Sequence, residues 1–281
     1  MPIIDLKNVT YRYFDVEKPA LKDLDLEIDE GDFVIITGPS GCGKTTICRC
    51  FNGLIPHFYN GELSGKIVVA GLDVKETQTS VLSQHVGFVF QNPENQLFAL
   101  SVEKDVAFSL ENIGLAREEI VERVEWALEM TGIIELREKA PYELSGGQQQ
   151  RVAIASVLAM KPEVVVLDEP TSFLDPLSAK RIFEVISSLN KDLGITVVLV
   201  EHRLDLASEY ANEAVVMDEG KVSFVGTPRD VFNDRDVWAL GVGIPKVTRL
   251  GHYLKERGID LGGVALTPSE AADLIRGYMN R

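Results

Sequence analysis

The sequence predicts an α/β fold with a core of buried parallel strands, a helical insertion, a small β-subdomain and a C-terminal helical appendage. Apolar runs that suit strands buried on both faces recur along the chain, at residues 33–36, 86–90, 164–167 and 195–200. Residues 92–160 are mostly helical in pattern and interrupt this series of strands. Two helix-start signals, at Thr227 and Thr267, lie beyond the last strand pattern and predict the appendage.

Length, net charge and hydropathy exclude some classes of function. The chain has 281 residues, of which 45% are hydrophobic, so it can build one large core or two modest ones. A net charge of −15 disfavours a nucleic-acid scaffold, and no nucleic-acid partner is expected. No apolar run approaches the roughly 18–20 residues of a membrane span, and the N-terminal pattern is not that of a signal peptide. If the protein serves a membrane, we expect it to act from the cytoplasm through a partner.

The three cysteines cluster in one short stretch, at Cys42, Cys48 and Cys50. An odd number in this placement indicates a reducing compartment and not a disulfide framework. Metal ligation by Cys48 and Cys50 is disfavoured because helical spacing puts them on different faces.

The strongest local pattern is a glycine-rich loop that follows the strand at 33–36. It matches G-x-x-x-x-G-K-[ST], the phosphate-binding P-loop, and comprises Gly38, Pro39, Ser40, Gly41, Cys42, Gly43, Lys44, Thr45 and Thr46. Glycines allow successive N–H groups to point at phosphate oxygens, and the next helix adds its positive N-terminus. Lys44 supplies charge for the β- and γ-phosphates, and the Thr45 hydroxyl can ligate Mg²⁺. The sequence therefore predicts a nucleotide site here.

The N-terminal region predicts the small β-subdomain. Residues 4–13 form one expected strand, residues 24–28 alternate apolar and acidic side chains as a half-buried strand does, and 66–70 form a third between Gly65 and Gly71. Tyr13 could stack on a nucleotide base, although packing in the core is the ordinary role of a single aromatic residue.

The insertion predicts helices at 102–112 and 118–130, the second with Val121, Val124 and Leu128 on one face. It closes with Leu-Ser-Gly-Gly-Gln at 144–148, where a further helix begins. A Ser-Gly-Gly turn at a helix start is either a second anion site or an ordinary loop-to-helix turn.

Polar side chains follow two later strands. Asp168 and Glu169 end the strand at 164–167, and Glu201 and His202 end the strand at 195–200. Ligands of open α/β sheets bind at the carboxyl ends of strands. We expect Asp168 to hold Mg²⁺ through water and Glu169 to polarise an attacking water. His202 is a further candidate, although a lone histidine is usually structural.

Taken together, these motifs resemble the ATP-binding-cassette (ABC) ATPase family. They occur in the family's order, as Tyr13, the Walker A loop, Gln91, the LSGGQ signature at 144–148, the Walker B pair Asp168 and Glu169, the D-loop at Leu174 and Asp175, and the switch histidine His202. LSGGQ in this position is highly specific, and the resemblance covers about residues 3–230. It implies an ATPase domain at 1–233, with its helical insertion at about 92–160, and a helical extension at 234–281.

The resemblance also implies roles for the site residues. It implies a head-to-tail dimer, of identical or different chains, in which ATP is held between one subunit's P-loop and the signature of the other (Ser145, Gly146, Gly147 and Gln148), with Asp175 nearby. Glu169 would be the general base, while His202 and Lys44 would hold the γ-phosphate. Mg²⁺ would be held by Thr45, Gln91 and Asp168.

Within the family, the chain most resembles ATPases of energy-coupling factor (ECF) importers. The segment Phe-Gln-Asn-Pro-Glu-Asn-Gln-Leu-Phe at 90–98 and the residues that follow carry this resemblance. It implies import of a vitamin or a transition-metal ion, with an integral-membrane transmembrane subunit and a substrate-binding membrane subunit as partners. The chain would then lie at the cytoplasmic side of the cell membrane, as a peripheral subunit. The acidic stretch 91–111, which includes Glu94, is expected either to form a groove for a basic helix of the membrane partner or to be a solvated face.

Three alternatives remain. The first is another ABC importer class, against which only the 92–98 segment and the tail argue. ABC-type ATPases that act on DNA carry a long coiled coil, for which the interval between Walker A and the signature is too short. ABC proteins of translation usually carry two cassettes in one chain, whereas this chain has one. Cys42 in place of the usual Ser, and Ser172-Phe173 in place of a small pair, depart from the family pattern without removing an ATP ligand.

Overall fold

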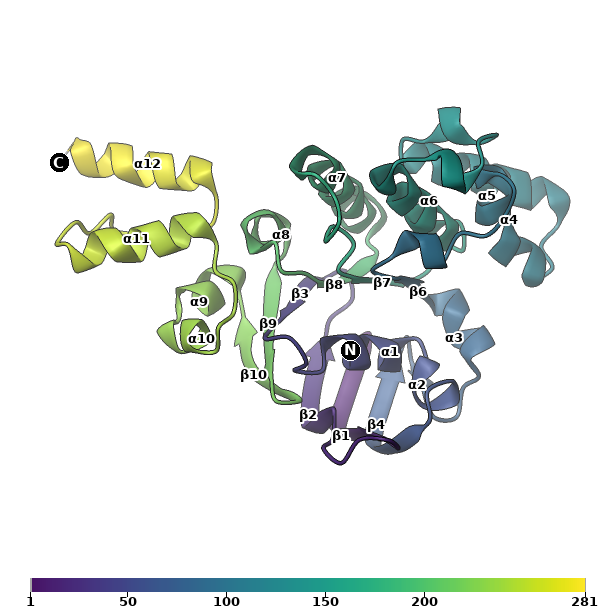
Figure 1. Cartoon of the computed structure of the whole chain (residues 1–281), viewed down its shortest axis with the longest axis horizontal. Helices are drawn as coiled ribbons and strands as arrows, with labels where there is room; N and C mark the ends of the chain where they lie inside the picture. The colour runs from purple at the N-terminus through teal and green to yellow at the C-terminus, as the bar shows by residue number, and fades with distance from the viewer. Residues whose placement is uncertain (1, 281) are drawn as a thin grey trace.

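The structure, a computed structural model, describes residues 2–280 and contains two sheets (Figure 1). Within that part of the chain the main sheet has six strands in the order β10-β9-β3-β8-β7-β6. Only β10 is antiparallel to its neighbour. These strands are β3 (Phe33–Thr37), β6 (Val86–Val89), β7 (Val164–Asp168), β8 (Thr196–Val200), β9 (Glu213–Asp218) and β10 (Lys221–Gly226). The predicted α/β fold with buried parallel strands is confirmed.

The small β-subdomain is an antiparallel sheet in the order β2-β1-β4-β5 over the described residues. Its strands are β1 (Ile4–Tyr13), β2 (Leu21–Ile28), β4 (Gly61–Val69) and β5 (Leu72–Asp73). The prediction of a short strand at 66–70 was wrong in extent, because β4 begins at Gly61 and passes through Gly65. There the φ angle is +81°, and an added Cβ would lie 2.3 Å from the Asn8 carbonyl oxygen. Glycine therefore permits an irregular crossing against β1 instead of ending the strand.

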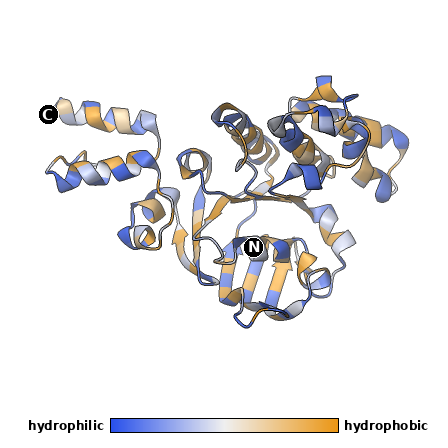
Figure 2. Cartoon of the chain, in the orientation of Figure 1, coloured by the Kyte–Doolittle hydropathy of each residue, from blue (hydrophilic) through white to orange (hydrophobic). Residues whose placement is uncertain are grey.

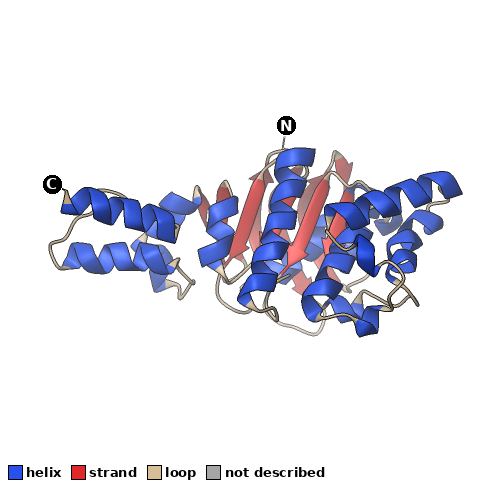
Figure 3. Cartoon of the chain, turned by 90° about the horizontal axis from the view of Figure 1, so that it is seen from above, coloured by secondary structure: helices blue, strands red, loops and turns tan. Residues whose placement is uncertain are grey.

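Helices cover both faces of the main sheet (Figure 1), and those on the upper face lie in front of the strands in Figure 3. On one face α1 (Lys44–Phe51) lies between the two sheets, with Val34 and Ile36 of β3 in its core. On the other face α7 (Pro176–Leu193) and α8 (Leu204–Tyr210) pack against Phe33 and Ile35. This alternation along β3 explains why the whole strand is apolar, and Figure 2 shows hydrophobic colour along the sheet strands. The short helices α2 (Leu54–His57) and α3 (Thr79–His85) connect β3 and β6.

The insertion forms a helical subdomain with a core of its own. It contains η1 (Pro93–Asn95), α4 (Val102–Asn112), α5 (Arg117–Met130), η2 (Ile134–Leu136), η3 (Pro141–Glu143) and α6 (Gly146–Leu158). Val124 and Leu128 are buried, as predicted, but Val121 is 48% exposed. The partly buried Ile120 takes its place, because i, i+4 spacing from Ile120 to Val124 points along the contact with the other helices.

The tail consists of α9 (Pro228–Asn233), α10 (Arg235–Ala239), α11 (Lys246–Glu256) and α12 (Pro268–Met279). The predicted caps are confirmed, since the Thr227 and Thr267 hydroxyls accept bonds from the N–H groups of Asp230 and Glu270. The helices α11 and α12 extend side by side away from the sheets (Figure 1).

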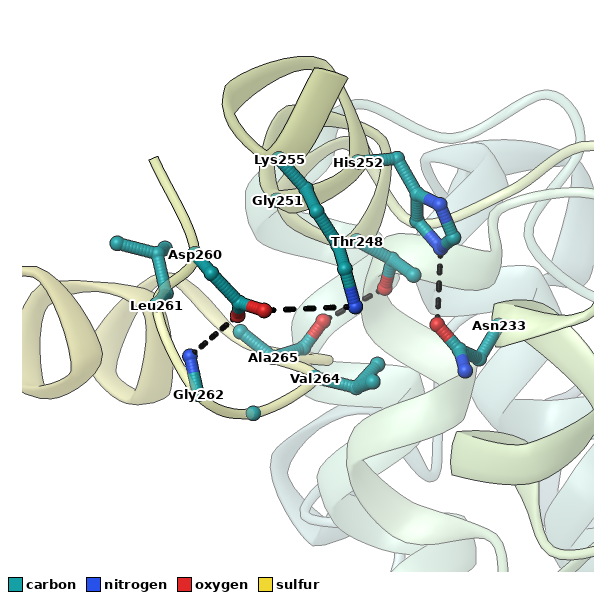
Figure 4. Close-up of a pocket in the computed structure, with 11 residues that line it drawn as sticks. Asn233, Thr248, Gly251, His252, Lys255, Asp260, Leu261, Gly262, Val264 and Ala265 are labelled. Carbon is teal, nitrogen blue, oxygen red and sulfur yellow. Dashed lines mark hydrogen bonds and ion pairs between the residues drawn. The ribbon is translucent and has the colours of Figure 1, made fainter. Parts of the chain in front are cut away.

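The first part of the tail packs on the core. Val237, Val242 and Ile244 belong to the same buried cluster as the main sheet. Three contacts at a cavity of about 400 Å³ then connect α11 to its surroundings (Figure 4). His252 Nε2 lies 2.8 Å from Asn233 Oδ1, the Thr248 hydroxyl donates to the Ala265 carbonyl oxygen at 2.6 Å, and Lys255 pairs with Asp260. No helix in residues 2–280 has the length and apolar character to cross a membrane.

Candidate active site

The glycine loop lies between β3 and α1 and is held against the end of β9. At Gly38, where φ is +149°, an added Cβ would lie 2.1 Å from the Met217 carbonyl oxygen. At Gly43, where φ is +109°, it would lie 2.6 Å from the Ala20 carbonyl oxygen. Only glycine fits at either position. The Lys44 ammonium is held in this loop by the carbonyl oxygens of Gly38 and Pro39, each at 2.9 Å.

The carboxylate Asp168 ends β7 beside the glycine loop and is 7% exposed. Burial raises its pKa, and a hydrogen bond with the Thr45 side chain opposes that rise. Thr45 and Asp168 thus bring two oxygen atoms together at the start of α1, which is the pairing predicted from the sequence.

Glu169 is the centre of the site. Gln91 Nε2 donates to Glu169 Oε2 at 2.8 Å, and His202 Nε2 lies 3.1 Å from Glu169 Oε1. The three side chains follow β6, β7 and β8, which are neighbours in the sheet. Glu169 has φ at +50°, a conformation that non-glycine residues seldom adopt, and its N–H donates to the Val200 carbonyl oxygen at 2.9 Å. The strand ends therefore hold both carboxylate oxygens from opposite sides.

Glu169, His202 and the P-loop residues share a cavity of about 400 Å³, whereas Gln91 and Asp168 do not line it. It is lined by Tyr13, Ala20, Ser40, Gly41, Gly43, Lys44, Thr45, Thr46, Glu169 and His202. Tyr13 packs at the core, as expected of a single aromatic residue, and its stacking on a base stays a prediction. Its ring packs edge-on against Tyr11 at the margin of the core, while its hydroxyl lies 3.2 Å from the Thr46 hydroxyl and accepts from Arg49 at 3.3 Å.

The signature residues do not line this cavity. Ser145 precedes α6, and its N–H donates to Gln148 Oε1 at 2.9 Å. A Cβ added at Gly147 would lie 3.0 Å from Ser178 Cβ, so the glycine allows α6 to approach α7 closely. Gly146 lines a separate cavity of about 430 Å³, together with Gln91, Asn92, Pro93, Glu94, Asn95, Gln149, Gln150, Pro170, Phe173 and Leu174.

Asp175 also forms its hydrogen bonds within its own chain. Its carboxylate caps α7 by accepting from the N–H groups of Leu177 and Ser178 at 2.9 and 3.0 Å. A side-chain hydrogen bond with Ser178 lowers its pKa. The structure thus gives Asp175 a structural role within its own chain and places it outside the P-loop cavity.

The cysteines lie in or beside the core around α1. Cys48 and Cys50 are fully buried, and burial raises the pKa of both thiols. Cys42 Sγ lies 3.9 Å from Lys44 Nζ within the P-loop. Among the described residues, no three His, Cys, Asp or Glu side chains are grouped so as to hold a metal ion.

Sequence reasoning missed two residues that hydrogen-bond beside the site, Glu201 and Arg203. Glu201 was noted only as a polar strand end, yet it is 1% exposed and accepts three hydrogen bonds. Arg203, which follows the histidine, donates to the Leu174 carbonyl oxygen at 2.7 Å. The adjacency of Glu201 to His202 was the only signal in the sequence.

A P-loop between a buried strand and a helix, with carboxylates at the end of a neighbouring parallel strand, defines a P-loop nucleoside-triphosphatase. The model of the ABC transporter family matches residues 21–172, which is more than half of the chain. The protein belongs to the ABC transporter family, and it is an ATPase of the ABC type.

Individual relatives agree with this assignment over nearly the whole chain. A putative ABC transporter ATP-binding protein of Pyrococcus abyssi is 46% identical over 260 residues, covering 92% of this chain and 93% of the relative. The energy-coupling factor transporter ATP-binding protein EcfA1 of Caldanaerobacter subterraneus subsp. tengcongensis is 42% identical, covering 97% and 98%. The predicted resemblance to ECF-type ATPases is confirmed.

Solved structures agree as well. CbiO1 of Clostridium perfringens, described as part of the ABC transporter complex cbiONQ, matches with a TM-score of 0.76 and 36% identity over 90% of this chain and 99% of CbiO1. The cassette MJ0796, solved as a dimer bound to ADP and Pi in a post-hydrolysis state, matches with a TM-score of 0.70 and 32% identity. That match covers 80% of this chain and 98% of MJ0796.

Proposed function

We propose that this ATPase subunit powers import of a micronutrient, either a vitamin or a transition-metal ion, through a membrane-embedded ECF-type complex. Support comes from the 42% identity to EcfA1 and from the likeness to CbiO1, which is part of a transporter complex. In that complex the chain is peripheral at the cytoplasmic side of the membrane. An integral-membrane transmembrane subunit and a substrate-binding membrane subunit are its partners.

The observation that carries the chemistry is the Glu169 carboxylate held between Gln91 and His202. In this proposal Glu169 accepts the proton of the water that attacks the γ-phosphate. Gln91 and His202 fix the carboxylate, and His202 also contacts the γ-phosphate. Each has a side-chain N–H that suits developing negative charge.

Phosphate binding falls to the P-loop in this proposal. The Lys44 ammonium exchanges the carbonyl oxygens of Gly38 and Pro39 for phosphate oxygens, while the backbone N–H groups of the loop surround the β-phosphate. The oxygen donors Thr45, Asp168 and Gln91 suit Mg²⁺, which prefers oxygen ligands. When bound, Mg²⁺ would offset negative charge on the phosphates.

Closure of the site requires a second cassette. Gly146, at the start of the signature helix, lines a different cavity from Lys44, and this separation favours contact with the phosphate of another cassette. Phe173 and Leu177, beside the signature and the D-loop, are 74% and 61% exposed. A head-to-tail dimer, of identical or different chains, would cover them and bring the N-terminus of α6 to the partner's ATP, where Ser145, Gly146, Gly147 and Gln148 contact the γ-phosphate.

Coupling to the membrane falls to an apolar groove between the helical subdomain and the core. Its volume is about 330 Å³, and it is lined in part by Phe90, Phe98, Phe108, Val157 and Met160. Phe98 is 64% exposed and packs edge-on against Phe108 at 4.6 Å. We propose that a helix of the transmembrane subunit inserts its apolar side chains here.

This location revises the sequence-based expectation of an acidic groove. Glu94 lies in the other cavity, beside Gly146, and Glu103 pairs with Arg137. Asp105 is 4% exposed and accepts the N–H groups of Phe98 and Ala99 at 3.1 Å. Glu94, Glu103 and Asp105 therefore do not form one surface, because the first lines another cavity, the second is paired and the third is buried.

Purification of the complex from its native membrane tests the proposal. Co-purification of a multi-span transmembrane subunit and a small substrate-binding membrane protein is expected. A periplasmic-type binding protein as the partner would favour another importer class. Recovery of nucleic acid or ribosomes, with no membrane subunit, would favour a DNA- or ribosome-acting ATPase.

A further inference from the structure

The least exposed carboxylate near the active site is Glu201, at the end of β8. It is 1% exposed and forms hydrogen bonds in two directions. Its Oε2 accepts from the Thr171 hydroxyl at 2.8 Å, and its Oε1 accepts from the backbone N–H groups of His202 and Arg203, both at 3.0 Å. Burial of a carboxylate is costly, and here three hydrogen bonds offset that cost. An apolar side chain would fill the same space without it, so we expect these hydrogen bonds to have a role.

Arg203 adds a second connection to the same loop. Its Nη2 donates to the carbonyl oxygen of Leu174 at 2.7 Å. The loop 170–175 is therefore held at Thr171 and again at Leu174, three residues further on. This loop begins directly after Glu169 and ends at Asp175, the cap of α7.

We propose that Glu201 is a positioning residue for hydrolysis. It fixes the peptide of His202, which keeps the imidazole Nε2 within reach of Glu169, and with Arg203 it holds the loop 170–175 against the histidine. A carboxylate suits this place because it only accepts hydrogen bonds, and three donors face it. The inference rests on the proposed role of His202.

The test compares variants of the full-length chain by steady-state ATPase kinetics. Glu201→Gln keeps the size of the side chain but replaces one accepting oxygen by an NH₂ group. This NH₂ group then faces either the Thr171 hydroxyl or the two backbone N–H groups. It should lower kcat by about tenfold or more and leave the KM for ATP within about threefold. Thr171→Val removes one donor and should cause a smaller loss. Ser208→Ala, which removes another buried hydroxyl whose bond is to Leu204, is the control and should leave kcat unchanged.

A double-mutant cycle separates positioning from a general structural defect. In the His202→Ala background, Glu201→Gln should add less than about a twofold further loss, because the group it positions is absent. Equal losses in both backgrounds, or wild-type kcat for Glu201→Gln alone, would overturn the positioning role. If His202→Ala alone leaves kcat unchanged, the role of His202 is wrong and the inference fails with it. Thermal melting of each variant checks the fold.

Discussion

Glu169 and His202 face each other across 3.1 Å, although 33 positions of the chain separate them. Gln91, 78 positions before Glu169, holds the other oxygen of the same carboxylate. Both supports present nitrogen to Glu169, which keeps the carboxylate directed towards the P-loop cavity that it lines. Several outcomes of mutation depend on this arrangement.

Glu169→Gln should reduce ATP hydrolysis by about 10²–10⁴-fold while ATP binding survives, because the amide cannot accept the proton of water. Single-turnover hydrolysis and binding of a fluorescent ATP analogue measure the two effects. Glu163→Gln, before the start of the same strand, is the matched control and should retain wild-type turnover. Turnover of Glu169→Gln within about threefold of wild type would show that Glu169 is not the base.

Catalysis should be shared between two cassettes. Ser145→Arg spoils the signature and Lys44→Ala spoils the P-loop, so a mixture of the two chains contains dimers with one intact composite site. Partial recovery of ATPase activity is expected if one site can act alone. The decisive measurement is a structure of ATP-bound Glu169→Gln, which should show Ser145 at the partner's nucleotide. Contact of Ser145 with its own chain's nucleotide would exclude the sandwich.

The α11–α12 hairpin should contribute to subunit association. It exposes Tyr253 (51%) and Met279 (78%), whereas Val242 and Ile244, which precede it, belong to the main core. Truncation after Pro245 therefore removes the hairpin and spares most of that core, unlike truncation before Trp238. Sedimentation without ATP should show a weaker dimer, with ATP binding retained. An unchanged monomer–dimer equilibrium would assign the hairpin to another role.

Phe98→Ser should impair assembly with the membrane subunits and substrate uptake, because it removes apolar area from the proposed docking groove. Loss of a buried phenylalanine contact is worth roughly 1.5–3 kcal/mol. The ATPase activity of the isolated subunit should remain nearly intact. Glu94→Ala is the comparison, since Glu94 lies in the other cavity. Greater harm from Glu94→Ala than from Phe98→Ser would restore the acidic surface as the docking site.

The base of the tail should lose stability as the pH falls. Burial lowers the pKa of His252 from its ordinary value of 6.5, and the charges of Arg235 and Lys255 act in the same direction against Glu256. The unfolded chain then binds a proton more readily than the folded one, so stability is complete above pH 6.5 and declines as pH falls towards the folded-state pKa. Melting curves at several pH values measure this effect. The melting temperature of wild type should fall below pH 6.5, and that of His252→Gln should fall less. An identical pH dependence would show that His252 makes no contribution.

The local parts of this protein could be predicted from sequence patterns alone. The P-loop could be predicted because its glycines, Lys44 and Thr45 act within one turn of chain, where backbone geometry depends on adjacent residues. The caps at Thr227 and Thr267 and the buried strands could be predicted for the same reason. The order of the motifs along the chain was enough to predict the ABC ATPase family.

Contacts between residues that are far apart in the chain could not be predicted in this way, because they depend on the tertiary fold. Strand order places Gln91, Glu169 and His202 at one edge, while the contacts of Glu201 with Thr171 and of Arg203 with Leu174 depend on how two loops pack. The apolar groove and the separation of the signature from its own P-loop likewise depend on how the helical subdomain lies on the core. Such contacts join residues far apart in the chain, and their geometry is fixed by packing of the whole core and not by any local pattern.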